Sequence, residues 1–198
     1  MILHLRRSLV FAVVCFVVFG VLYALAGTGI AQALFPRQAN GSLTADGSTL
    51  IGQNWTSTRW FHGRPDGFGP YAANPSKGVP GGDNPLVANG VPGGSGATNL
   101  GPRSKALVAD TRQLIAWWHA HGVDPTTDLV TTSGSGYDPD ITPQDALVQI
   151  PMVSKATGVR PAVLRHLIAS QTRGRQLGFL GSPTVDVLQL NRALARLE

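Results

Sequence analysis

The sequence predicts a mixed α/β (α+β) domain that is exported and anchored by one N-terminal transmembrane helix. Three observations point to this fold class. No residue between Arg7 and Arg37 is charged, which indicates a membrane span. Apolar residues recur at helical spacing over much of 103–198. Short runs at 48–53 and 128–132 are typical of strands.

Composition excludes several other classes of protein. The chain has 198 residues, of which 43% are hydrophobic and 14% charged, and it contains 24 Gly and 14 Pro. So many turn formers exclude a coiled coil or an all-helical bundle. A single Cys cannot form an internal disulfide. The net charge of +5 is spread without a dense basic run, so no nucleic-acid binding is predicted.

The N-terminal segment is long and apolar enough to cross a membrane. We assign 8–34 as the transmembrane helix, because a hydrocarbon core of about 30 Å needs about 20 helical residues. A cleaved signal peptide is the alternative, since Ala24-Leu25-Ala26 and Ala31-Gln32-Ala33 both fit a small-x-small cleavage pattern. The apolar run exceeds the roughly 7–15 residues of a signal-peptide core, which favours an uncleaved anchor.

The flanking charges predict the orientation of this helix. His4, Arg6 and Arg7 precede it, whereas only Arg37 lies close behind it. Positive residues tend to stay in the cytoplasm, so 1–7 is predicted to be cytoplasmic and 35–198 extracytoplasmic. A cleaved signal peptide would export the same domain.

The exported part is predicted to begin with short strands at 48–53, Trp55 and Trp60-Phe61. A Gly- and Pro-rich loop over 61–102 follows, far longer than the usual connection of about 4–6 residues. Apolar spacing around Leu114 and Trp118 then predicts a helix that Gly122 ends.

The C-terminal part is predicted to hold a strand at 128–132, a tight turn at 133–136 and three helices. Thr142 and Pro143 form a strong helix start, and this helix should run to Gly158. The next helix should run from Pro161 to near Gly174, and the last should open at Ser182-Pro183.

The usual catalytic signatures are absent from the sequence. The Ser133–Gly136 turn lacks the spacing of a nucleophile elbow, and no phosphate-binding P-loop is present. His119 and His121 point to different sides of a helix, which makes a poor metal pair. We therefore predict no catalytic site, no metal and no cofactor of its own.

Two carboxylates leave one enzymatic alternative open. Asp138 and Asp140 resemble the start of a calcium loop, but Pro143 and Gln149 stand where that loop needs Gly and Glu. A turn and helix-start role is the favoured interpretation. The rival hypothesis is a membrane-anchored envelope hydrolase that uses Asp138 or Asp140.

Short motifs come in a distinctive order along the whole chain. They are LIGQ at 50–53, FHGRP at 61–65, GSGATNLGP at 94–102, DLVTTSGSGYD at 128–138, QIP at 149–151, GFLG at 178–181 and VLQLN at 187–191. In this order they resemble KdpC, the C subunit family of the Kdp potassium-transporting ATPase. The chain departs from the family pattern in the expanded Gly- and Pro-rich loop between Arg64-Pro65 and Asn99, and at Met152, Thr157 and Asp186.

The resemblance implies an accessory subunit of a four-subunit pump in the inner membrane, with a periplasmic C-terminal domain. In that family the A subunit carries potassium, the B subunit is a P-type ATPase that hydrolyses ATP, and the small F subunit helps to stabilise the assembly. The C subunit is implied to act as a catalytic chaperone that raises the ATP affinity of the B subunit. The implied partners are the A, B and F subunits and membrane lipid.

The predicted orientation conflicts with a direct nucleotide site, because ATP is cytoplasmic and 35–198 is predicted to lie outside. We therefore expect the domain to dock on the outer face of the potassium-carrying subunit. If nucleotide or a partner is contacted by polar loop residues, the candidates are Ser133, Ser135 and Gln149. Their alternative roles are turn formation and hydrogen bonding to helices.

Overall fold

The computed structural model describes residues 2–45, 47–53, 55, 57–65, 98–136 and 138–197. It divides into two compact units, Met1–Ala45 and Asp46–Glu198, which are considered separately below. Most of the Gly- and Pro-rich loop predicted over 61–102 falls on 66–97, outside the described residues.

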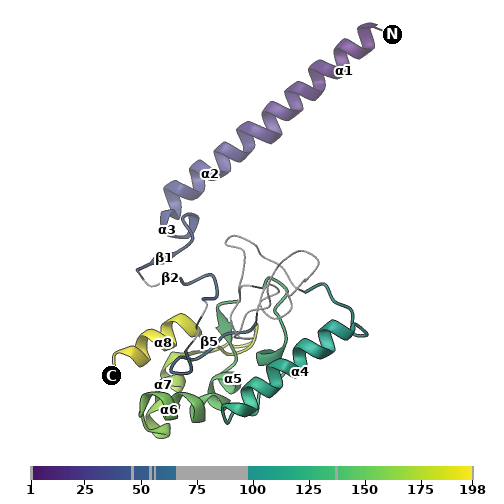
Figure 1. The fold of residues 1–198 in the computed structure, drawn as a ribbon. Coiled ribbons are helices and arrows are strands. Elements are labelled where there is room, and N and C mark those ends of the chain that lie inside the picture. The colour runs from purple at the N-terminus through teal and green to yellow at the C-terminus, as the bar shows by residue number, and fades with distance from the viewer. Residues whose placement is uncertain are drawn as a thin grey trace. The chain divides into compact units, whose positions relative to one another are not determined.

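The first unit consists mainly of one long apolar helix (Figure 1). It is built from α1 (Ile2–Cys15), a π-helical segment η1 (Phe16–Leu22) and α2 (Tyr23–Leu34). The stretch Leu3–Leu34 has a mean hydropathy of 2.8 in its most apolar window and is long enough to cross a membrane. The helix includes the predicted 8–34 span and continues back to Ile2. The short helix α3 (Pro36–Ala39) and strand β1 (Leu43–Thr44) follow it.

The second unit is the predicted mixed domain of helices and a small sheet (Figure 1). Its antiparallel sheet has the order β3-β5-β4, with Val185 of the central strand opposite Ile141 on one side and Thr172 on the other. Helix α7 packs against α5, α6 and α8. The strands are β2 (Gly47–Ser48), β3 (Asp140–Ile141), β4 (Thr172–Arg173) and β5 (Thr184–Asp186). The helices are α4 (Lys105–Ala120), α5 (Pro143–Val148), α6 (Ile150–Thr157), α7 (Pro161–Gln171) and α8 (Val187–Ala195).

The predicted helix ends and starts are confirmed where a local capping signal exists. The α4 helix ends before Gly122, whose φ of 74° needs a residue that adopts the left-handed region easily. Thr142 begins α5 with a capping box, in which its hydroxyl accepts from the Asp145 N–H and the Asp145 carboxylate accepts from the Thr142 N–H. Gly158, with a φ of 75°, closes α6.

The predicted strand at 48–53 is wrong. Strand β2 contains only Gly47 and Ser48, and the chain then turns. The Gln53 amide donates to the carbonyls of Ser48 and Ile51, which folds this segment on itself instead of leaving it extended. Side-chain bonding of this kind competes with ladder formation.

The predicted strand at 128–132 is also wrong. Asp128–Val130 form a 3₁₀ helix, η4, and both Leu129 and Val130 are buried. A strand places neighbouring side chains on opposite faces, whereas this turn sends both into the same core. The Trp118 indole N–H donates to the Leu129 carbonyl and holds the turn in place.

Three predicted helix limits shift because the sheet and Pro151 intervene. The single helix predicted up to Gly158 is two helices that meet at Gln149, since the Pro151 nitrogen has no hydrogen to donate. Helix α7 ends at Gln171 because the next two residues form β4. The last helix begins at Val187, since 184–186 forms the central strand.

Two side-chain amides pin one extended segment to the helical core. The Asn191 amide accepts from the Phe61 N–H and donates to the Phe61 carbonyl, both at 2.8 Å. The Gln149 amide pairs with the next residue in the same way, accepting from the His62 N–H at 2.8 Å and donating to the His62 carbonyl at 3.0 Å. All four residues are buried. These amides replace the strand partner that 61–62 lacks, and we call the pair the amide clamps.

Replacing Asn191 by Leu should destabilise the second unit by about 2–4 kcal/mol, because the Phe61 N–H and carbonyl would then be buried without partners. Urea unfolding of the full chain in detergent, followed by tryptophan fluorescence, measures this loss. Gln144→Leu is the control, since Gln144 is exposed on α5. Equal stability of the two variants would contradict a structural role for the clamp.

Candidate functional site

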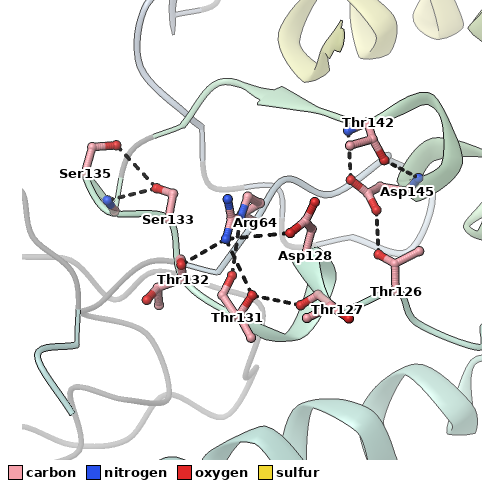
Figure 2. A network of polar contacts seen from close by, with 11 residues as sticks. Arg64, Thr126, Thr127, Asp128, Thr131, Thr132, Ser133, Ser135, Thr142 and Asp145 are labelled. Atoms are coloured by element: carbon pink, nitrogen blue, oxygen red, sulfur yellow. Dashed lines mark hydrogen bonds and ion pairs between the residues drawn. The ribbon is translucent and has the colours of Figure 1, made fainter. Parts of the chain in front are cut away.

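A polar network surrounds Arg64 and the 126–136 loop (Figure 2). The Arg64 guanidinium donates to the carbonyls of Thr132 at 3.0 Å and Thr131 at 3.4 Å. Its Nη2 lies 3.8 Å from a carboxylate oxygen of Asp128. The Arg64 side chain is 23% exposed, so its charge is partly shielded from solvent. Arg64 therefore joins the segment held by the amide clamps to the loop.

The loop is shaped by its own short-range contacts. The Thr131 hydroxyl donates to the Thr127 carbonyl at 2.8 Å, across the η4 turn. The resulting turn leaves the carbonyls of Thr131 and Thr132 directed at Arg64, as Figure 2 shows. A guanidinium fits this position because its fork of N–H groups can donate to several oxygens at once.

Two of the three predicted contact residues lie together in the turn that follows. The Ser133 hydroxyl accepts from the Gly136 N–H at 3.0 Å and lies 3.3 Å from the Ser135 hydroxyl (Figure 2). Gly136 has a φ of 72°, as the predicted tight turn requires. Ser133 is buried and Ser135 is exposed, so of the two it is Ser135 that a ligand or partner could reach.

Gln149, the third predicted contact residue, makes hydrogen bonds away from this turn. Its side chain is 0% exposed, and its amide bonds to the backbone of His62 and to the Asp145 carbonyl, the latter at 3.1 Å. The bond to Asp145 fits the alternative role of hydrogen bonding to helices, whereas the bonds to His62 hold an extended segment. Contact of nucleotide or a partner with Ser133, Ser135 or Gln149 remains a prediction.

Asp145 and Arg64 are two residues of the network to which the sequence analysis assigned no site role. Besides its capping box, the buried Asp145 carboxylate accepts a short hydrogen bond from the Thr126 hydroxyl (Figure 2). Asp145 thereby ties the start of α5 to the 126–136 loop. The signals available in the sequence were the Thr142-x-x-Asp145 spacing and the FHGRP motif at 61–65.

The carboxylates of the hydrolase hypothesis lie around β3. The Asp138 carboxylate accepts from the Asp140 N–H at 3.1 Å, the turn role predicted for it. Asp140 stands opposite Asp186 in the sheet, and Arg173 lies 3.4 Å from the Asp186 carboxylate. Burial raises the pKa of the Asp140 carboxyl, Arg173 opposes this shift, and the charges of Asp186 and Asp138 add to it.

His119, on α4, and His121, the residue that caps its C-terminal end, have different partners. His119 lies 3.4 Å from the Asp124 carboxylate, whereas His121 stacks on Trp117 with ring centroids 3.9 Å apart. Within the described ranges, no three His, Cys, Asp or Glu residues are grouped so that they could hold a metal ion.

His62 occupies an aromatic enclosure beneath α4. Its ring meets Trp117 and Trp118 edge-on, with centroids 5.9 and 5.8 Å away. Burial lowers the pKa of His62 to about 4; the backbone of Trp55 opposes the shift, and nearby His121 adds to it. His62 is therefore neutral at physiological pH.

These features fit a membrane-anchored protein that has a long apolar helix and a mixed helix-and-sheet domain. The chain belongs to the KdpC family: the family model described as K+-transporting ATPase, c chain, matches residues 5–196. The match takes in the long helix as well as the domain.

Curated relatives agree with the family match over full length. A potassium-transporting ATPase KdpC subunit of Methylobacterium nodulans is 45% identical over 100% of this chain and 98% of the relative. KdpC subunits of Rhodopseudomonas palustris and Gloeobacter violaceus are 43% and 42% identical, over 98% and 96% of this chain and 97% and 92% of those relatives. The family resemblance predicted from the ordered motifs is therefore confirmed.

Acid should weaken the second unit through His62. Between pH 6.5 and about 4 the unfolded chain binds a proton at this residue and the folded chain does not, so stability falls as the pH falls. The full shift corresponds to about 3 kcal/mol. Urea unfolding of the full chain in detergent at pH 7 and pH 4 measures the loss.

His62→Phe is the matched variant, because Phe retains an aromatic ring against Trp117 and Trp118 and cannot titrate. The variant should lose less stability than the parent chain over the same pH interval, by about the same 3 kcal/mol. Identical pH dependence in both proteins would contradict the buried neutral state.

Proposed function

We propose that this chain is the accessory C subunit of a potassium-uptake P-type ATPase, in which it stabilises the complex and raises the ATP affinity of the B subunit. The observation that carries the proposal is the family match over residues 5–196, which spans both the long apolar helix and the second unit. The proposed partners are the potassium-carrying A subunit, the ATP-hydrolysing B subunit, the small F subunit and membrane lipid. Potassium is the transported ion.

The chain is proposed to have no catalytic site or cofactor of its own. The polar side chains that could have formed a site are used to hold the fold: Gln149 and Asn191 clamp a backbone segment, and Asp145 caps α5. Asp186 similarly caps α8, accepting from the Gln189 N–H at 2.9 Å. ATP would be bound and hydrolysed by the B subunit.

We propose that the domain acts from the extracytoplasmic side. Arg6 and Arg7 before the helix favour a cytoplasmic N-terminus, which places the second unit across the membrane from ATP. An effect on ATP affinity must then be indirect, through the membrane subunits. This is a coupling free energy between two sites and needs no nucleotide contact by this chain.

Co-purification and kinetics test the accessory role. The tagged full chain, extracted in mild detergent, should bring down the A, B and F subunits. A complex made without it should show a higher KM for ATP, and adding the chain back should lower that KM. The isolated chain should hydrolyse no ATP, nor should it act on envelope substrates. Retention of no ATPase subunit, or an unchanged KM, would overturn the proposal.

Thiol labelling in intact cells tests the orientation. With Cys15→Ala as background, a cysteine at Gln113, which is exposed on α4, should react with a membrane-impermeant reagent. His4→Cys on the same background is the matched control and should react only after lysis. If the His4→Cys variant reacted in intact cells and the cysteine at position 113 did not, the orientation would be the opposite of the one proposed.

A further inference from the structure

A small hairpin projects apolar side chains from the second unit, between β4 and β5. The backbones of Gln176 and Leu180 bond to each other in both directions at 2.9 Å and close the hairpin. At its tip Leu177 is 82% exposed, Phe179 69% and Leu180 47%. Elsewhere among the described residues of this unit, only Leu50 and Ile51 form a comparable exposed pair. We call residues 175–181 the apolar hairpin.

The hairpin holds these side chains in a fixed and strained shape. Leu177 has a φ of 52°, and Gly178 follows with a φ of 83°. A leucine in the left-handed region costs roughly 1–2 kcal/mol, so the fold sustains strain in order to present this side chain. A preset shape of this kind lowers the entropy that binding must overcome.

Basic groups accompany the apolar tip. Arg175 is exposed at the start of the hairpin, and Arg173 of β4 is 59% exposed on the side chain. Arg173 lies against the buried Asp186 carboxylate, which anchors the base of the hairpin to the sheet. A matching surface would therefore combine an apolar pocket with acidic groups at its rim.

We propose that the apolar hairpin is the anchor by which the domain docks into an acidic-rimmed apolar pocket on a partner membrane subunit. This inference rests on the proposed accessory function and names the element that makes the contact. The hairpin is proposed to bind a protein pocket and not a lipid surface, because insertion among fluid lipid chains requires no fixed side-chain arrangement. A strained, closed turn that fixes the positions of Leu177 and Phe179 favours binding to a protein surface of defined shape.

Photocrosslinking tests the occupant directly. Benzoylphenylalanine in place of Phe179, in the assembled complex in native membranes, should crosslink the full chain to one of the large membrane subunits. The same group in place of Leu50 is the control and should crosslink at least about tenfold less. Crosslinking of position 179 to lipid alone, or equal crosslinking from both positions, overturns the proposal.

Retention of partner subunits measures the importance of the contact. Leu177→Asn with Phe179→Ser removes both large side chains, and Asn tolerates the positive φ, so the turn survives. This double variant should retain roughly tenfold less of the membrane subunits in detergent, since aromatic anchors dominate such interfaces. Leu50→Ser with Ile51→Ser is the matched control and should retain them fully. Unchanged thermal unfolding verifies that both variants fold.

The outcomes separate this inference from the accessory function. Full retention by the hairpin variant, with the parent chain also retaining its partners, overturns the hairpin proposal and leaves the accessory role standing. No retention by the parent chain overturns both. Arg175→Glu should also lower retention, and the loss should shrink in high salt. If the Arg175→Glu variant retains the membrane subunits as well as the parent chain does, the proposed acidic rim of the partner pocket is contradicted.

Discussion

The second unit depends on the two amide clamps that hold Phe61 and His62. An extended segment buried in a core must have its N–H and carbonyl groups bonded, and a sheet normally supplies the partners. Here the described strands are only two or three residues long, and Asn191 and Gln149 supply the bonds instead. Because Gln149 is the junction between α5 and α6 and Asn191 lies on α8, the clamps also fix these helices around one segment.

The clamps determine where the polar network lies. Arg64 follows the clamped pair by two residues, so its backbone position is fixed. Its guanidinium can therefore donate to the carbonyls of Thr131 and Thr132. Asp145 reaches the same loop from the cap of α5. The loop is thus held from two sides by residues of the core. A loop held in this way is better suited to binding a partner as a rigid surface than to opening and closing around a small ligand.

The helices could be predicted from the sequence far better than the strands. Helix ends carry local signals such as Thr142, Gly122 and Gly158, and these caps act through neighbouring residues alone. The runs at 48–53 and 128–132 resembled strands, but whether a run pairs depends on a distant partner that the sequence does not name. In the polar network, the turn that brings Ser133 and Ser135 together could be predicted, because its signal is local. The bonds from Arg64 to Thr131 and Thr132 and from Gln149 to His62 join residues 67 to 87 positions apart, and no sequence-spacing rule predicts contacts over such a separation.

The sheet and the clamps form one continuous structure from the apolar hairpin to the core. The hairpin lies between β4 and β5, and β5 leads directly into α8 through the Asp186 cap. Asn191, one turn further along α8, holds Phe61, and Arg64 follows in the chain. A partner that holds the hairpin therefore acts on the same short helix that fixes the polar network. Packed interiors shift as connected units and do not deform gradually, so we expect any effect of docking at the hairpin on the 126–136 loop to pass along this chain of contacts.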